Sequence, residues 1–160
     1  MNQHMEGGCA CETVRYRLTR APMITHCCHC TWCQRETGSA FVINAVIESS
    51  AVDLLGAAPE VILTPSHSGK GQMVARCPEC QVAVWSHYPT AREAAAFIRT
   101  GTLDNRRAIT PDVHIFTSTK VDWVTITDGK PAFPEFYPDP ARVWRPESRA
   151  RWEKVLASRT

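Results

Sequence analysis

Short segments with a strand-like pattern of apolar and polar residues recur along most of the chain. TVRYRL at 13–18 alternates with the two-residue period of a strand that has one buried face, whereas AFVINAVI at 40–47 is mostly apolar and rich in β-branched residues. The chain has 11 prolines and 8 glycines, which punctuate these segments as expected between short strands. The other predicted strands are MVARC at 73–77, VAVWSHY at 82–88, VHIFT at 113–117 and DWVTIT at 122–127.

Two segments have a helical pattern instead. TAREAAAFI at 90–98 begins with a plausible N-cap at Thr90 and predicts one or two helical turns. Segment 139–157 has apolar residues at helical spacing, and Pro146 divides it, so that a final helix begins near Glu147. The pattern predicts one mostly-β domain over residues 1–160, with a core at about 7–135 and a helical C-terminal extension at 139–157.

Composition narrows the classes of partner. The formal net charge is +2, from 18 basic and 16 acidic residues, which is too balanced to favour nucleic acid or an anionic membrane as a partner. No apolar run approaches the roughly 20 residues of a membrane-spanning helix. The N-terminal residues lack the pattern of a signal peptide, so a cytoplasmic protein is expected. A homo-oligomer is left open.

The eight cysteines fall into three groups: Cys9 and Cys11, then 27–33, then Cys77 and Cys80. In a reducing compartment, closely spaced cysteines bind metal more often than they form disulfides. The C-x-C and C-x-x-C pairs each bring two thiolates to one point, and a structural zinc site needs four. The first and last pairs together supply four, although 66 residues separate Cys11 from Cys77 and spacing alone leaves this pairing open.

The middle group differs because Cys28, Cys30 and Cys33 supply three ligands from one segment. Three protein ligands leave a fourth position for a guest, which is typical of reactive rather than structural zinc. Cys27, His26 or His29 could close that position. On an extended strand, however, Cys27 and His29 point away from Cys28 and Cys30, which favours an open site.

Three other interpretations compete with a reactive zinc site. CPEC at 77–80 could be a redox pair, but a strand-like segment follows it rather than the helix of a βαβ unit. An iron–sulfur cluster could use four cysteines, but the C-x-C spacing does not match the ferredoxin patterns. Alternatively, both zinc ions are structural and nothing is catalysed.

The order of these motifs resembles that of the glutathione-dependent formaldehyde-activating enzymes and their relatives, which include centromere protein V. The matching segments cover about residues 7–133, and their ordered combination is much more specific than any single C-x-x-C pair. They are GGCACETVRYRL, CCHCTWCQRETGSAF, ARCPECQVAVW, RTGTLD and PDVHIFTSTKVDW.

The resemblance implies a β-tent fold with two zinc ions. It assigns Cys9, Cys11, Cys77 and Cys80 to a structural zinc, assigns Cys28, Cys30 and Cys33 to the second zinc, and leaves Cys27 as an extra residue. The implied activity is that of a carbon–sulfur lyase, joining formaldehyde to glutathione as S-hydroxymethylglutathione. The family usually has glycine after the first and last cysteine pairs, where this chain has Glu12 and Gln81. These departures leave the ligands intact but put the substrate in doubt.

Several other residues are candidates for contact with a small thiol such as glutathione. Arg35 follows the second cysteine group by two residues and could bind an anionic end of the substrate, or be a solvated surface arginine. Gly38 and Ser39 could form a backbone turn near that anion, or a plain turn before a strand. Lys70 could lie at the edge of a cleft, or at a solvated hairpin tip. His114, in a predicted strand, is the histidine best placed for proton transfer, although a core histidine is the plainer interpretation.

The remaining candidates have structural interpretations. Asp104 is expected to stabilise the turn GTLD by bonding to nearby backbone. Trp32, Trp85 and Trp123 could line a pocket, yet burial in the core is the simpler expectation. Taken together, the sequence favours a zinc-dependent carbon–sulfur lyase-like enzyme. Two alternatives are a non-catalytic zinc module that binds glutathione or another thiol, and a purely structural zinc scaffold.

Overall fold

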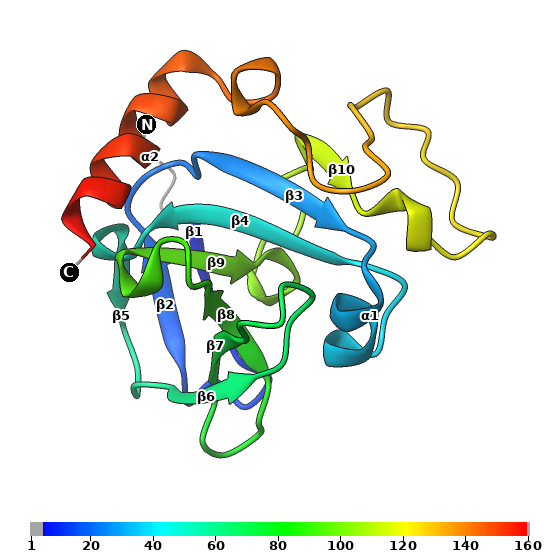
Figure 1. The fold of residues 1–160 in the computed structure, drawn as a ribbon. Helices are drawn as coiled ribbons and strands as arrows, with labels where there is room; N and C mark the ends of the chain where they lie inside the picture. Colours follow the sequence, from blue (N-terminus) through cyan, green and yellow to red (C-terminus); the bar gives the residue numbers. More distant parts are fainter. Residues whose placement is uncertain (1–4, 160) are drawn as a thin grey trace.

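A strongly twisted sheet of seven strands forms the body of the protein, and a computed structural model describes residues 5–159 (Figure 1). Neighbouring strands pair antiparallel, except that β10 and β3 are parallel. The strand order is β10 (Val113–Ile115), β3 (Ile24–Cys28), β4 (Val42–Glu48), β9 (Ala95–Arg99), β8 (Ala83–His87), β7 (Gln72–Arg76) and β6 (Glu60–Thr64).

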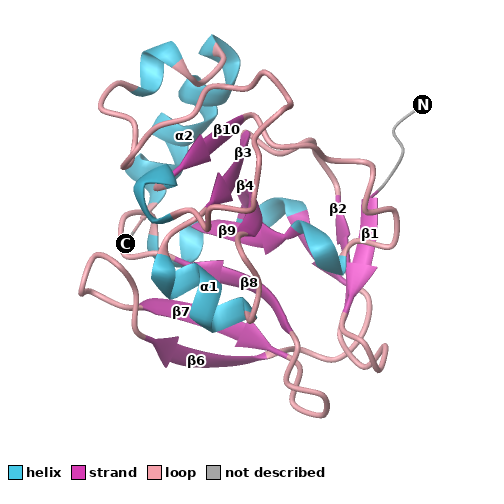
Figure 2. Ribbon diagram, turned by 90° about the vertical axis from the view of Figure 1, so that its right-hand side faces the viewer, coloured by secondary structure: helices cyan, strands magenta, loops and turns pink. Residues whose placement is uncertain are grey.

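A second, smaller sheet packs on one side of this body (Figure 2). It contains β1 (Met5–Gly8), β2 (Arg15–Leu18) and β5 (Val52–Leu54) in that order. Its buried side chains, among them Tyr16 and Leu18, join Ile47 and Ile98 of the large sheet in one apolar cluster. Burying each such side chain stabilises the fold by about 1.5–3 kcal/mol relative to leaving it exposed.

Two α-helices flank the strands of the large sheet nearest β10. Helix α1 (Thr31–Thr37) begins after Cys30, whose side chain caps it, and ends at Gly38, which has a left-handed φ of 65°. Helix α2 (Pro146–Ser158) begins at a proline, whose fixed φ suits the first helical position, and buries Val155 against the second apolar cluster. Within residues 5–159, neither helix is long and apolar enough to span a membrane.

The structure confirms the mostly-β class with a short C-terminal helix. It also confirms strands in the segments predicted at 13–18, 40–47, 73–77, 82–88 and 113–117, within two residues at their ends. Strands β1, β3, β5 and β6 were not among the predicted segments.

Two predictions were wrong. The segment predicted as helix at 90–98 has only a 3-10 turn at Arg92–Ala94, and then forms strand β9. Strand β9 lies between β4 and β8 and is mostly buried, so its apolar run reflects an interior strand rather than a helix. The strand predicted at 122–127 is absent: this segment is a loop in which the side chain of Trp123 is 78% exposed.

Each outer cysteine pair is followed by a residue with left-handed backbone. Glu12 has φ 64° and Gln81 has φ 60°, and their amides donate to the carbonyl oxygens of Cys9 and Cys77. In the family that the chain resembles, glycine is usual at these two positions. A side chain in this conformation costs roughly 1–2 kcal/mol, so both turns carry strain that glycine would remove.

Replacing the exposed Glu12 by glycine should therefore stabilise the protein. We expect Glu12→Gly to raise the free energy of unfolding by about 1 kcal/mol, because relief of strain exceeds the added entropy of the unfolded chain. Ala10→Gly, in the same turn but at a negative φ, should lower it. Urea unfolding of the metal-loaded protein, followed by tryptophan fluorescence, measures the free energy of unfolding of each variant. An equal loss of stability in the two variants would contradict the backbone strain at Glu12.

A buried ion network holds α1 against the large sheet. The Glu36 carboxylate lies 2.6 Å from a guanidinium nitrogen of Arg76 on β7 and 2.9 Å from one of Arg99 on β9. The side chains of Glu36 and Arg99 are only 5% and 6% exposed, and Arg99 also donates to Asn44 Oδ1 at 2.6 Å. Removing the carboxylate charge would leave the Arg99 charge buried and uncompensated, which is far more costly than losing an exposed pair.

We therefore expect Glu36→Gln to lower the free energy of unfolding by about 3 kcal/mol. The matched control is Asp104→Asn, which breaks the exposed pair between Asp104 and Arg15 and should cost less than about 1 kcal/mol. Denaturant titrations of the two variants compare these costs. Losses of similar size would show that the Glu36 network does not anchor α1.

Candidate functional site

Four sulfurs meet where two turns from different sheets come together. Cys9 and Cys11 lie in the turn after β1, and Cys77 and Cys80 lie in the turn after β7; their four sulfurs are within 4.8 Å of one another. The Cys11 sulfur is 3.5 Å from that of Cys9 and 3.6 Å from that of Cys77, and all four thiols are free. Sulfurs bound tetrahedrally to zinc at about 2.3 Å lie about 3.8 Å apart, so the cluster fits such an ion.

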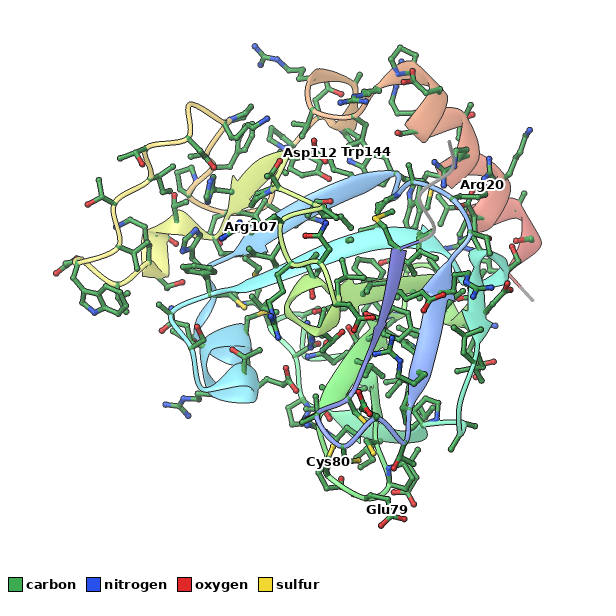
Figure 3. The ribbon with its side chains drawn as sticks, turned by 180° about the vertical axis from the view of Figure 1, so that it is seen from behind. Arg20, Glu79, Cys80, Arg107, Asp112 and Trp144 are labelled. Carbon is green, nitrogen blue, oxygen red and sulfur yellow. The ribbon has the colours of Figure 1, made fainter. Side chains whose placement is uncertain are left out.

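Backbone amides around this cluster point at the sulfurs. The Val14 amide donates to Cys9 Sγ at 3.3 Å, and the Glu79 amide donates to Cys77 Sγ at 3.4 Å. The backbone N–H of Val82 is the largest influence on Cys80 and lowers the pKa of its thiol to about 6. Such donors favour the thiolate form that a metal ligand needs. Figure 3 labels Cys80 and Glu79 at the tip of the molecule farthest from Trp144.

Three more sulfurs gather at the junction between β3 and α1. Cys28 ends β3, Cys30 is the N-cap of α1, and Cys33 is the buried residue of that helix. Their sulfurs are within 4.8 Å of one another, and the Cys33 amide donates to Cys30 Sγ at 3.3 Å. Hydrogen bonds from the Cys28 and Cys33 thiols lower the pKa of Cys30. This donor set suits a soft or borderline cation.

None of the residues that could have closed the three-sulfur cluster belongs to it within residues 5–159. His26 Nε2 instead pairs with the Tyr137 hydroxyl at 2.8 Å, and burial lowers the pKa of His26 to about 4, which keeps the ring neutral. Cys27 and His29 group with His114, away from Cys28. The cluster therefore has three protein sulfurs and a free side.

That free side faces a cavity of about 360 Å³, whose wall includes Cys28, Cys30 and Cys33. This volume is within the range of small-molecule sites. Arg149 is the only lining residue with a permanent charge among the described residues, and its Nε atom has no hydrogen-bond partner. The aromatic lining residues are Trp32, Tyr88, Phe97, Phe116, Phe136, Tyr137, Trp144 and Trp152.

The other predicted contacts lie outside this cavity. Arg35, Gly38 and Ser39 are exposed on or just after α1, and Gly38 serves as the C-cap of that helix. Lys70 is exposed in the loop between β6 and β7 and borders a different cavity, beside Tyr88 and Arg159. The structure thus brings together the sulfurs of the predicted cysteine ligands but not the four predicted substrate contacts.

His114 also lies away from the cavity. It is buried in the middle of β10, where its Nε2 pairs with Asp128 Oδ2 at 2.8 Å and its Nδ1 lies 3.0 Å from His29 Nε2. This grouping could not be predicted from the sequence, because the parallel pairing of β3 and β10 joins segments 87 residues apart (the separation of Cys27 and His114).

Three smaller expectations can be compared with the structure. Asp104 bonds mainly to the side chain of Arg15, at 2.8 and 2.5 Å, rather than to nearby backbone through its carboxylate. Trp85 is buried in the core as expected, whereas Trp32 is 42% exposed at the rim of the cavity. Most cavity residues from 66–72 and 136–152 were missed, since no local pattern in those segments marks a binding surface.

The chain is similar to one protein family and, at low identity, to solved structures. Among solved structures, a Rhodobacter sphaeroides protein is similar at 17% identity and a TM-score of 0.47, covering 67% of this chain and 92% of its own; at this level the likeness supports no conclusion. No curated protein matches the chain. The family described as "Glutathione-dependent formaldehyde-activating enzyme" matches residues 4–119, which is most of the chain and includes all eight cysteines. The chain therefore belongs to the glutathione-dependent formaldehyde-activating enzyme family.

Proposed function

We propose that the protein is a zinc-dependent carbon–sulfur lyase-like enzyme that acts on the adduct of a small thiol and an aldehyde, as S-(hydroxymethyl)glutathione synthase does. The observation that carries this proposal is the position of Cys28, Cys30 and Cys33, which form a three-sulfur cluster in the wall of a ligand-sized cavity. The four-sulfur cluster of Cys9, Cys11, Cys77 and Cys80 would hold a second, structural zinc. Eight free thiols suit a reducing compartment such as the cytoplasm.

Zinc fits both donor sets, since thiolate sulfur is among its preferred ligands. When bound at the three-cysteine site, zinc would supply Lewis acidity and hold a guest thiol as its thiolate. Deprotonation alone contributes little to the rate. A thiol with a pKa near 8.5 is about 3% ionised at pH 7, so full deprotonation raises the thiolate population by at most roughly 30-fold. Orientation of the two reactants must supply most of the rate enhancement.

The reaction needs little else from the protein. The thiol sulfur bonds to the carbonyl carbon, the π-electron pair of the C=O bond moves to oxygen, and the proton lost from sulfur ends on that oxygen. The aromatic walls would hold the two reactants together and exclude bulk water. The Tyr137 hydroxyl, fixed by His26 and by the indole N–H of Trp144, lies in this wall as a polar group among apolar ones.

The lining favours a substrate that is more apolar than glutathione. Glutathione carries two carboxylates and one ammonium group, whereas Arg149 is the only permanent charge that residues 5–159 place in the wall. Burying the unmatched charges of glutathione in an aromatic cavity would be costly. We therefore propose a thiol–aldehyde adduct with an apolar or aromatic group and at most one carboxylate. Arg35, Gly38, Ser39 and Lys70 would contact only parts of a substrate that extend outside the cavity.

A non-catalytic thiol-binding module is the second candidate. It is favoured by the placement of His114, the histidine predicted for proton transfer, on β10 outside the cavity wall. Two histidines line the cavity: His26 is already paired with Tyr137, and the ring of His67 packs against Phe116. Because thiols add to formaldehyde without a catalyst, a binder could capture the adduct without accelerating its formation.

Metal analysis distinguishes the two clusters. We expect Cys77→Ser to be insoluble or unfolded, because structural zinc contributes roughly 10–16 kcal/mol while a domain is stable by only about 5–15 kcal/mol. Cys30→Ser should stay folded and lose one equivalent of zinc. Mass spectrometry measures the zinc content of the two variants, and circular dichroism measures whether each is folded. If both variants collapse equally, the three-cysteine cluster is structural too.

Exchange spectroscopy tests the activity with glutathione and with benzyl mercaptan as an apolar thiol. We expect the wild-type protein to accelerate exchange between formaldehyde and its benzyl mercaptan adduct by about tenfold or more, and to act less on glutathione. Cys30→Ser should lose the acceleration, whereas Thr25→Val, a volume-matched change on β3 outside the cavity wall, should keep most of it. Binding without acceleration would establish the module instead, and no binding of either thiol would reject both functions.

A further inference from the structure

A third group of ligand-type side chains lies on the opposite face of β3. Because side chains alternate along a strand, Cys27 and Cys28 point to opposite sides of the sheet. In the parallel ladder between β3 and β10, Cys27 is the direct partner of His114. His29 follows two residues after Cys27, and its amide continues the ladder by donating to the Ile115 carbonyl oxygen at 3.0 Å. The register of two strands thus brings these three side chains together.

The distances within this group suit a bound metal ion. His29 Nε2 lies 3.0 Å from His114 Nδ1 and 3.6 Å from Cys27 Sγ, and the three ligand atoms are all within 4.8 Å of one another. Around tetrahedral zinc, with bonds of about 2.0–2.1 Å to nitrogen and 2.3 Å to sulfur, the N–N and S–N separations are about 3.3 and 3.6 Å. Small shifts of the two rings would therefore admit an ion.

A carboxylate prepares His114 for this role. His114 Nε2 lies 2.8 Å from Asp128 Oδ2, and the other oxygen of Asp128 accepts the Lys130 amide at 3.0 Å. An ionised carboxylate only accepts hydrogen bonds, so the proton of a neutral His114 ring is on Nε2 and its lone pair is on Nδ1. This is the carboxylate–histidine arrangement commonly found behind metal-binding histidines. It aims the free lone pair at His29 and Cys27.

The whole group is removed from solvent. Cys27, His29 and His114 are 2%, 0% and 6% exposed, and the His29 ring also packs against Phe41. Two adjacent buried imidazoles could instead form a metal-free chain, with His29 Nε2–H donating to His114 Nδ1. That chain leaves the buried Cys27 thiol without a role, whereas a metal ion uses all three atoms. His29 Nδ1 has no partner in either arrangement and does not distinguish them.

We propose that Cys27, His29 and His114 form a third metal site, selective for a borderline divalent cation such as Zn²⁺, with Asp128 as the positioning residue. Two imidazoles and one thiolate suit zinc rather than magnesium or calcium, which prefer oxygen ligands. None of the three ligands lines the aromatic cavity, so the site is separate from the proposed thiol site. It would fasten β10, and the loop that carries Asp128, to β3.

The test uses the full chain and two probes, Zn²⁺ for stoichiometry and ¹¹³Cd²⁺ for ligand identity by NMR. We expect the wild-type protein to retain three equivalents of zinc after desalting. With cadmium, it should show three resonances, of which one has the shift of a site with one sulfur and two nitrogens. Cys27→Ala should lose one zinc equivalent, and of the three cadmium resonances it should lose only that of the site with one sulfur and two nitrogens. Thr25→Val, a volume-matched change two residues earlier on β3, should keep all three zinc equivalents and all three cadmium resonances.

Asp128→Asn provides a test that leaves all three ligands in place. A change behind a ligating histidine commonly weakens metal binding by about 10–100-fold, so the third equivalent should be lost at lower chelator concentration than in the wild-type protein. This comparison also decides the question if Cys27→Ala fails to fold. Retention of only two equivalents by the wild-type protein under excess zinc, with no mixed sulfur–nitrogen cadmium resonance, would overturn the site in favour of the metal-free histidine chain.

Discussion

The alternation of side chains along β3 is the constraint on which the chemistry of this protein depends. Two consecutive cysteines in a strand cannot serve one metal ion, because Cys27 and Cys28 point to opposite faces. Strand β3 is also central in its region, since it pairs with β4 on one side and β10 on the other. One face therefore meets the aromatic cavity and the other meets His114. A shift of one residue in the register of β3 would exchange the two environments.

The four-sulfur cluster joins the two sheets. Its two halves come from turns 66 residues apart, and each turn needs a left-handed residue directly after its cysteine pair. Glu12 and Gln81 meet this need at the expense of backbone strain. We infer that metal binding offsets that strain, since the ion is worth far more than either turn costs. The closed four-sulfur cluster would then stabilise the fold, and the open three-sulfur cluster would supply the chemistry.

Local patterns in the sequence were sufficient for part of this arrangement. C-x-C and C-x-x-C spacings predict which sulfurs meet within each pair, because each pair is fixed by a few backbone dihedral angles. The pairing of Cys9 and Cys11 with Cys77 and Cys80 was left open by spacing and followed only from the family resemblance. The alternation in 13–18 likewise predicts β2. Features that depend on distant partners were not predictable in this way. The Ala- and Phe-containing run of β9 resembles a helix until its neighbours β4 and β8 are known, and Trp123 belongs to a segment with strand-like alternation but no partner strand.

The composition of the cavity was hidden for the same reason. Its walls come from β3, β4, β10, α1 and the segments at 66–72, 88–97 and 136–152, which meet only in the folded chain. Diffraction from crystals of the zinc-loaded protein at the zinc absorption edge tests the open site most directly. It should give an anomalous peak within bonding distance of the sulfurs of Cys28, Cys30 and Cys33, with the fourth coordination position directed into the aromatic cavity. A protein side chain in that fourth position, or no peak among these sulfurs, would contradict the open site.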